Sequence, residues 1–289
     1  MPPASVRTSV ACCRCCAAGL RRPPVSNPPI LRPSVDGTDH NPKAAPVTLI
    51  TGGTRGIGAA TARRLAAAGH RLALGYRSNT AAADVLAAEL RDSGAEVFLV
   101  SADISTEAGI DALFDAVLEH FGHLDNVVSN AGATLHIGPL ANTPREIVRA
   151  VLEINLTSAV FVAQRAVQEF LTAGTPGVLV NVSSTAARNG SPNTYVHYAA
   201  AKAGVDALTQ GLAAEVAPQG IRVVGVAPGT TLTDIHADAG SPDRALKAAA
   251  RIPLGRPADP DEIAAAIAWL LTPDASYTAG TTIRLSGGA

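Results

Sequence analysis

From residue 47 onward, short apolar runs alternate with longer stretches rich in alanine and leucine. The short runs predict strands at residues 47–50, 71–76, 96–100, 124–128, 178–182, 221–226 and 281–285. The longer stretches predict helices at residues 57–68, 81–92, 106–121, 145–171, 198–216 and 260–271. The strands carry little charge, which is typical of strands covered on both faces. This alternation predicts an α/β fold with a single doubly wound parallel sheet of about seven strands and helices on both faces.

Residues 229–257 follow a predicted strand end and show no clear periodicity. A flexible segment at that position is a candidate lid over a site. The sequence contains no internal repeat and no sign of a second folded domain.

Composition changes this picture little. The chain has 289 residues, of which 47% are hydrophobic and 16% charged, which suits one soluble domain with a large core. A net charge of −1 gives no reason to expect a nucleic-acid partner. Since no apolar run reaches the ~20 residues that cross a bilayer, no membrane partner is expected either.

Residues 1–46 differ from the rest of the chain, because they contain all four cysteines and nearly half of the prolines. The prolines block helix, so we expect a disordered extension at residues 1–46 before a folded domain at residues 47–289. The run Cys12-Cys13-Arg14-Cys15-Cys16 has Cys-x-x-Cys spacing, but no second ligand pair follows to complete a zinc site. The alternative to a nonfunctional extension is a targeting or lipidated segment. A body without cysteine fits a reducing cytoplasm.

The first predicted strand leads into a glycine-rich loop with the sequence Thr51-Gly52-Gly53-Thr54-Arg55-Gly56-Ile57-Gly58. Gly52 permits a tight turn, Gly56 lets the backbone approach a pyrophosphate, and Gly58 lets the helix pack on the strand. Backbone N–H groups and the helix dipole would then face the phosphates. Because strand, loop, helix and second strand follow in order, the loop predicts a Rossmann-type dinucleotide site and not a turn alone.

The type of dinucleotide depends on the end of the second strand. An NAD site usually has an acidic residue there, about 20 residues past the loop, that holds the ribose 2′-hydroxyl. This chain has Tyr76-Arg77-Ser78 and no acid until Asp84. Arg77 can pair with a 2′-phosphate and Arg55 can face it from the other side, unless both arginines are merely solvated. The sequence therefore favours NADP(H) over NAD(H).

Tyr198 and Lys202 lie four residues apart in a predicted helix, so they share one face. A nearby ammonium lowers the pKa of a phenol and makes proton exchange with a substrate oxygen feasible. Tyr195 has Ala199 four residues later and is set aside. The strand at residues 178–182 ends at Ser183-Ser184-Thr185, where a hydroxyl can hold a substrate oxygen beside the tyrosine.

Taken together, these residues resemble the short-chain dehydrogenase/reductase family over residues 47–289, with a likeness to its 3-oxoacyl-carrier-protein-reductase-like and glucose-1-dehydrogenase-like members. The matching motifs occur in the family's order: Thr51-Gly52-x-x-x-Gly56-x-Gly58, Asp103, Asn130-Ala131-Gly132, Asn155, Ser184, Tyr198-x-x-x-Lys202, Pro228-Gly229 with Thr233, and Gly287-Gly288.

The resemblance implies an oxidoreductase that transfers a hydride between a nicotinamide cofactor and a carbonyl or alcohol. Ser184 would polarise the carbonyl, Tyr198 would protonate it, and Asn155 would hold a water in a proton relay to Lys202. Asp103 would bind the adenine. The resemblance assigns cofactor binding to Gly52, Thr54, Arg55, Gly56, Ile57, Gly58, Arg77, Ser78, Asp103, Ile104, Asn130, Ala131, Gly132, Tyr198, Lys202, Pro228, Gly229, Thr231 and Thr233.

Each implied role has a structural alternative. Asp103 can be a helix N-cap, Asn155 a polar residue within a helix, and Pro228-Gly229 a simple turn. The chain also departs from the family pattern in three places. Ser129 and Val224 stand where asparagines are common, and the interval from Ser184 to Tyr198 is one residue longer than usual.

The substrate is expected to be a small carbonyl or alcohol compound. Residues free to line its pocket are His136, Ile137, Thr194, His197, His236 and the segment 230–252. No histidine has defensible metal-ligand spacing, and the reaction needs no metal because the cofactor carries the hydride chemistry. No basic cluster for an acyl carrier protein stands out.

The rival interpretation is a regulatory protein that binds the dinucleotide without turnover, although such relatives usually lack one of the four reacting residues. The family also suggests a homotetramer with the helices at residues 145–171 and 198–216 between subunits.

Overall fold

The computed structural model describes residues 45–289. The predicted extension at residues 1–46, with its cysteines, lies almost entirely outside the described residues, and its boundary stays a prediction. The strands are β1 (Val47–Thr51), β2 (Arg71–Tyr76), β3 (Val97–Ser101), β4 (Asn126–Ser129), β5 (Val178–Val182), β6 (Arg222–Pro228) and β7 (Thr282–Leu285).

All strand pairs are parallel, in the order β3-β2-β1-β4-β5-β6-β7. The order reverses direction between β1 and β4, so the carboxyl ends of these two strands border the crevice where such sheets bind ligands. The sequence prediction of a single doubly wound parallel sheet is confirmed. The apolar runs of β1 and β6 are buried along nearly their whole length, as a sheet covered on both faces requires.

The helices that alternate with the strands are α1 (Gly56–Ala67), α2 (Thr80–Asp92), α3 (Glu107–Phe121), α4 (Arg145–Leu152), α5 (Ser158–Ala173), α6 (Ala186–Asn189), α7 (Val196–Val216), α8 (Arg244–Ala248) and α9 (Pro260–Leu270). Their ends have chemical causes. The Thr106 hydroxyl accepts a hydrogen bond from the Gly109 N–H at 3.0 Å and begins α3. Gly122, with φ of 76°, ends it in the left-handed conformation. Asp259 and Glu262 form a capping box at the start of α9.

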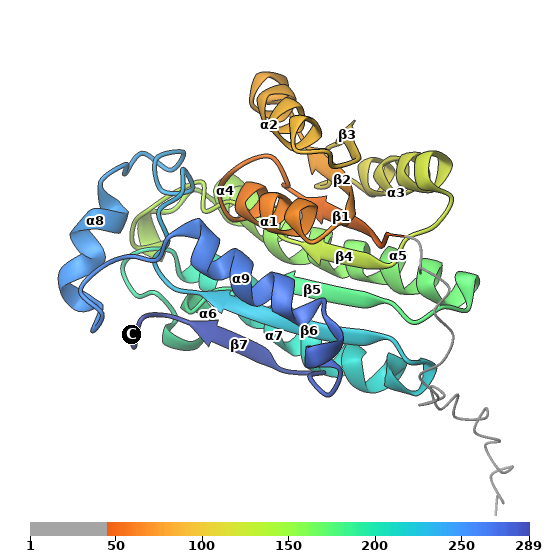
Figure 1. Ribbon diagram of the computed structural model, residues 1–289. Coiled ribbons are helices and arrows are strands. Elements are labelled where there is room, and N and C mark those ends of the chain that lie inside the picture. Colours follow the sequence, from red (N-terminus) through yellow and green to blue (C-terminus); the bar gives the residue numbers. More distant parts are fainter. Residues whose placement is uncertain (1–44) are drawn as a thin grey trace, which may run out of the picture. The chain divides into compact units, whose positions relative to one another are not determined.

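Helices cover both faces of the sheet (Figure 1), and an apolar cluster lies between the sheet and the helices on each face. Neighbouring residues of β1 face opposite ways, so Leu49 packs with α3, α5 and α7, whereas Ile50 packs with α1, α2 and α9. Phe114 of α3 and Phe170 of α5 are fully buried in the first cluster. Burying a phenylalanine side chain contributes roughly 1.5–3 kcal/mol.

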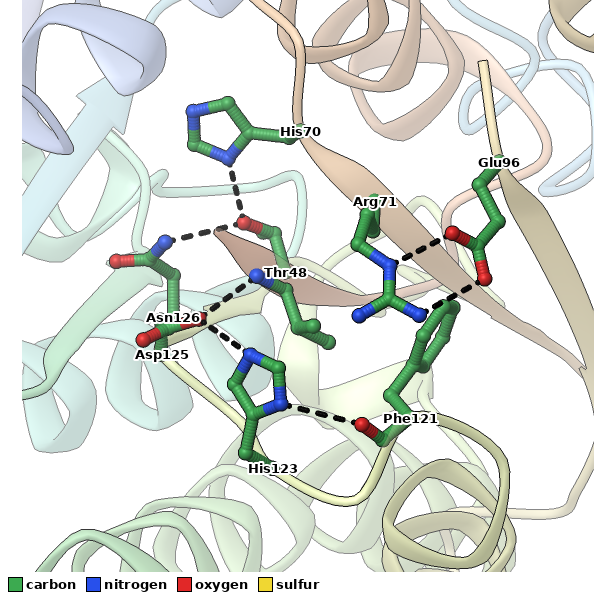
Figure 2. Close-up of polar contacts among 9 residues, drawn as sticks. Thr48, His70, Arg71, Glu96, Phe121, His123, Asp125 and Asn126 are labelled. Carbon is green, nitrogen blue, oxygen red and sulfur yellow. Dashed lines mark hydrogen bonds and ion pairs between the residues drawn. The ribbon is translucent and has the colours of Figure 1, made fainter. Parts of the chain in front are cut away.

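Polar contacts occupy the amino ends of the central strands (Figure 2). The Val47 N–H donates to Asp125 Oδ2 at 2.8 Å. The Thr48 hydroxyl lies 2.8 Å from His70 Nδ1 and accepts from Asn126 Nδ2 at 3.1 Å. These contacts join β1 to the residues before β2 and β4. This end of the sheet is structural, which leaves the carboxyl ends for ligands.

One stretch that was predicted as a single helix is interrupted in the structure. The stretch predicted as one helix at residues 145–171 is interrupted by a π-helical turn at Glu153–Thr157, between α4 and α5. Periodicity of apolar residues does not reveal such a turn, because it widens the helix by a single residue. Helix α7 begins at Val196, so Tyr198 lies within its first turn. The predicted lid, residues 229–257, contains the short helix α8.

Candidate active site

A cavity of about 1020 Å³ lies at the carboxyl ends of β1, β4, β5 and β6. It collects most of the residues predicted for the cofactor and the chemistry. Those that line it are Gly52, Thr54, Arg55, Gly56, Ile57, Arg77, Ser78, Asp103, Ile104, Asn130, Ala131, Gly132, Ser184, Tyr198, Lys202, Pro228, Gly229, Thr231 and Thr233. Gly58 and Asn155 are not among the lining residues.

The glycine loop between β1 and α1 depends on its glycines for two different reasons. Gly52 and Gly56 have φ of 61° and 49°, a left-handed conformation that other residues adopt only with strain. Gly58 has no room for a side chain, since an added Cβ would lie 2.1 Å from the Gly52 carbonyl oxygen. Helix α1 has no side-chain cap and no acid in its first turn. Its free N–H groups therefore suit an anion such as a pyrophosphate.

Asn130 fixes the glycine loop to the end of β4. Its Nδ2 donates to the carbonyls of Thr51 and Gly52, each at 3.0 Å. The Thr51 hydroxyl accepts in return from the N–H groups of Asn130 and Ala131, at 3.0 and 3.1 Å. These four bonds hold the two sides of the crevice in one geometry, so Asn130 positions the loop as well as lining the cavity.

Asp103 lies at the other end of the cavity, beside Arg77. Its Oδ1 accepts from the Ser105 N–H at 3.0 Å and the Ser105 hydroxyl at 2.7 Å. These bonds, followed by the nearby Arg77 guanidinium, lower the pKa of Asp103. The alternative role of Asp103 as the cap of α3 is wrong, because Thr106 supplies that cap.

The two arginines expected near a 2′-phosphate have different surroundings. Arg55 Nη1 lies 3.4 Å from Asp238 Oδ2 and 4.0 Å from Asp234 Oδ2, both on residues 229–257. Arg77 makes no ion pair with a carboxylate in the described part of the chain. Arg77 is therefore the freer of the two cations at that end of the cavity, and Arg55 faces the lid.

Lys202 is tied to the main chain of the neighbouring strand. Its Nζ donates to the Val182 carbonyl, at the end of β5, at 2.8 Å. The Ser183 hydroxyl donates to the Lys202 carbonyl at 3.2 Å. Lys202 Nζ lies 5.8 Å from the centre of the Tyr198 ring. These bonds join helix α7 to the end of β5. Ser184 follows that strand end directly, so the predicted reacting groups come from two elements that are bonded to each other.

Burial controls the protonation of this pair. It raises the pKa of Tyr198 above that of an ordinary phenol; the charge of Tyr195 adds to the rise and the Ser184 hydroxyl opposes it. Burial also lowers the pKa of Lys202 to about 8, against the opposing charge of Asp206. The expected lowering of the tyrosine pKa is not met in this state, because desolvation has the largest effect on the Tyr198 phenol.

Asn155 belongs to the π-helical turn and is buried. Its Nδ2 donates to the Ala133 and Val151 carbonyls at 2.7 and 2.8 Å, and its Oδ1 accepts from the Ala133 N–H at 3.2 Å. A Cβ on Gly132 would lie 2.6 Å from Asn155 Oδ1 and 3.4 Å from Lys202 Nζ. Asn155 is therefore no ordinary polar residue within a helix, because it fixes the chain after β4 close to Lys202.

The substrate end of the cavity differs in part from expectation. Thr194 and His236 line it, whereas His136, Ile137 and His197 do not. Arg244 and Arg251 line it and belong to the segment 230–252 that was expected there, whereas Tyr195 lines it without having been predicted. Tyr195 was set aside for lacking a lysine partner, but its ring packs edge-on against Tyr198 at 5.3 Å between centres. No sequence signal singled out the two arginines within an aperiodic segment.

Within residues 45–289, no cluster of three or more potential metal ligands occurs. No helix in the same range is long and apolar enough to span a membrane.

Comparison with known proteins gives consistent results. Residues 52–289 match the family model described as enoyl-(acyl carrier protein) reductase. The chain is 41% identical to an uncharacterised oxidoreductase of Escherichia coli, YgfF, over 84% of this chain and 99% of the relative. It is 40% identical to cis-4-hydroxycyclohexanecarboxylate dehydrogenase of Sinomonas cyclohexanicum, over 84% of this chain and 95% of the relative.

A solved structure, the 3-ketoacyl-(acyl-carrier-protein) reductase of Brucella melitensis complexed with NADH, superposes with a TM-score of 0.78 at 32% identity. The match covers 84% of this chain and 97% of that one. These proteins are oxidoreductases, and none supports a non-catalytic role. The chain therefore belongs to the short-chain dehydrogenase/reductase family, and it is an oxidoreductase that uses a nicotinamide dinucleotide to interconvert a carbonyl and an alcohol.

Proposed function

We propose that Tyr198, Ser184 and Lys202 carry out the proton chemistry of this carbonyl–alcohol conversion, and that Asn155 positions them. The observation that carries the proposal is spatial. Tyr198, Ser184 and Lys202 line the same cavity as the glycine loop, although they come from different elements. Pockets that combine a dinucleotide loop with groups of perturbed pKa are the default sites of catalysis.

The role of each residue follows from its surroundings. The Ser184 hydroxyl donates a hydrogen bond to the substrate carbonyl oxygen, and Tyr198 gives that oxygen its proton. Burial keeps the Tyr198 phenol protonated at neutral pH, which suits proton donation during carbonyl reduction. Lys202, whose pKa is lowered to about 8, is the neighbouring group that can donate or accept a proton near neutral pH. Asn155 Oδ1 keeps a second lone pair for the proton relay that the family resemblance implies.

The cavity fits the dinucleotide that the family uses. Two glycines with left-handed backbone and the uncapped N-terminus of α1 form a cradle for its diphosphate. Asp103 lies where the adenine would bind, and Pro228, Gly229, Thr231 and Thr233 line the nicotinamide end. When bound, the dinucleotide supplies or accepts the hydride.

The central test replaces Tyr198 by phenylalanine, with Tyr195→Phe as the matched control on the adjoining ring. Removal of a general acid typically costs 10²–10⁴-fold in rate. We expect Tyr198→Phe to lose kcat to that extent while fluorescence titration shows unchanged dinucleotide binding. Tyr195→Phe retains its ring and should keep turnover. Equal turnover by wild type and Tyr198→Phe would refute the assigned role.

We also propose that NADP(H) is the preferred cofactor. Arg77 directly follows β2, lines the cavity near Asp103 and forms no ion pair with a carboxylate in the described residues. Tyr76-Arg77-Ser78 contains no acid to hold a free 2′-hydroxyl. The Arg55 ion pairs with Asp234 and Asp238 are exposed, and exposed pairs contribute only about 0–1 kcal/mol. Arg55 can therefore exchange its partners for a 2′-phosphate.

Titration with NADPH and NADH measures this preference. We expect Arg77→Asp to weaken NADPH binding and spare NADH, because the new carboxylate repels the 2′-phosphate and can accept from the 2′-hydroxyl. Arg63→Asp is a matched control, since Arg63 pairs with Glu89 on the outer side of α1 and does not line the cavity. Tighter binding of NADH than NADPH by the wild type would overturn the assignment.

A homo-oligomer, with a tetramer suggested by the family, also remains a proposal. Val160 and Leu171 of α5 are exposed apolar side chains on one of the helices predicted to pack between subunits. Light scattering after size-exclusion chromatography measures the mass directly. A monomeric mass across the working concentration range would contradict the proposal.

A further inference from the structure

Arg244 of α8 is a cation without a counter-ion at the substrate end of the cavity. It is half-buried, lines the cavity and forms no ion pair with any carboxylate in the described part of the chain. Its guanidinium carbon lies 5.3 Å from the centre of the Tyr195 ring. A guanidinium that faces a cavity without an ion-pair partner is suited to bind an anion, so this placement indicates a site for one.

Arg244 is close to the reacting group. The Tyr195 ring lies between Arg244 and the reacting tyrosine. The Arg244 guanidinium lies over the Tyr195 ring, and the Tyr198 ring packs edge-on against it at 5.3 Å between ring centres. All three residues line one cavity. A small molecule whose carbonyl oxygen lies at Tyr198 can therefore extend to the Arg244 guanidinium.

The acidic residues of the same segment do not neutralise this end of the cavity. Asp234 and Asp238 face Arg55 on the cofactor side. Asp243 lies 3.8 Å from Lys247, one turn along the exposed side of α8.

Two neighbours leave the positive charge in place. His236 is buried, and burial together with the nearby Arg244 lowers its pKa, so the imidazole is neutral at neutral pH. Arg251 lines the same cavity and likewise has no carboxylate partner within the described residues. The substrate end thus presents two guanidinium groups, neither of which forms an ion pair with a carboxylate in the described residues.

We propose that the substrate carries a carboxylate at a distance from the reacting carbonyl, and that Arg244 binds this carboxylate with Arg251 adding positive charge. The inference rests on the proposed function of Tyr198 and Ser184. Guanidinium groups bind carboxylates through two parallel hydrogen bonds, which gives both orientation and affinity. Arg244 would fix which carbonyl of a substrate meets Tyr198, and it is a specificity-determining residue.

The experiment compares matched ketones with one enzyme preparation. The probes are 4-oxocyclohexanecarboxylate, its uncharged carboxamide, and unsubstituted cyclohexanone, each assayed for kcat/KM with NADPH. The variants are Arg244→Met, Arg244→Lys and Arg251→Met. Lys247→Met is the matched control, because Lys247 lies on the same helix but does not line the cavity.

Wild type should prefer the carboxylate over the carboxamide. Hydrogen bonds to a charged group carry an effect of roughly 10- to 100-fold. Arg244→Met should remove that much of the preference while cyclohexanone turnover stays near wild type. Arg244→Lys should keep part of the preference, Arg251→Met should reduce it less, and Lys247→Met should leave it unchanged.

The outcomes separate the possible failures. If Arg244 only holds the lid on Tyr195, Arg244→Met will lower turnover of all three ketones equally, which overturns the inference. Neutral ketones reduced without any carboxylate preference in the wild type also overturn it and leave the proposed function standing. If none of the three ketones is reduced, the substrate is not a cyclohexanone, and this result does not bear on the roles of Tyr198 and Ser184. Calorimetric binding of cyclohexanecarboxylate to wild type and Arg244→Met then decides whether the anion site exists.

Discussion

Replacing Asn155 by alanine removes three side-chain hydrogen bonds from a buried position. Two of them hold the backbone of Ala133 and one holds the Val151 carbonyl. Each such bond contributes about 0.5–1.5 kcal/mol net, and groups left unpaired cost more. We therefore expect the free energy of unfolding to fall by about 2–4 kcal/mol. Since domains have about 5–15 kcal/mol in total, the variant should still fold.

The same change should damage catalysis. The Ala133 segment lines the cavity beside Gly132, whose missing side chain leaves room for Asn155 Oδ1. A misplacement of about 1 Å in a reacting site costs up to about 100-fold in rate. We expect kcat to fall by one to two orders of magnitude, to be measured beside urea unfolding of the same preparations.

Asn181→Ala is the matched control for this prediction. Asn181 of β5 is fully buried, and its Nδ2 donates to the Thr209 hydroxyl at 3.0 Å, outside the cavity lining. It should lose about 1 kcal/mol of stability and keep wild-type turnover. If Asn155→Ala retained both the wild-type unfolding midpoint and wild-type kcat, the assigned positioning role would be wrong.

Three further predictions follow from the site and the sheet. Because the pKa of Lys202 is lowered to about 8, its ammonium is present below that pH and lost above it. The value of kcat/KM for carbonyl reduction should therefore fall above pH 8. A kcat/KM that stayed constant up to pH 10 would contradict this prediction. Gly132→Ala should lower kcat and cost about 1–3 kcal/mol, since its Cβ would meet Asn155 Oδ1 at 2.6 Å; kinetics and urea unfolding test both. Burial lowers the pKa of His70 in the folded protein. As the pH falls through the ordinary pKa of a histidine, the unfolded chain therefore binds a proton at His70 before the folded protein does. The free energy of unfolding should fall over that pH range. His70→Gln should weaken this acid dependence in unfolding scans, and an unchanged dependence would exclude His70 as a cause.

The sheet could be predicted from sequence because its signal is local. Each strand is a short apolar run, and the glycine loop carries a spacing with a direct steric cause. The π-helical turn could not be predicted, since Asn155 is held there by the Ala133 backbone, which is distant in sequence. The bond from Lys202 to the Val182 carbonyl has no side-chain signal at position 182.

The pKa of Tyr198 could not be predicted from the sequence for a similar reason. The spacing of Tyr198 and Lys202 indicated that they share a helix face, but not how deeply they are buried. Desolvation depends on every element packed around them, and it is the largest cause of the raised pKa of Tyr198. The segment 230–252 was expected to line the pocket, but Arg244 could not be singled out within it, because its contact with Tyr195 joins residues that are distant in sequence.

The hydrogen bond from Lys202 Nζ to the Val182 carbonyl has a consequence for which parts of the chain can change during evolution. The residues proposed to react belong to α7 and to the end of β5, whose packing tolerates little change. Arg244 and Arg251 belong to residues 229–257, an irregular segment in which substitutions disturb little of the core. Mutations there can exchange one substrate for another without rebuilding the chemistry. Directed evolution toward new ketones should therefore concentrate its libraries on the part of this segment after Thr233, which contains Arg244 and Arg251, and leave the ends of the strands alone.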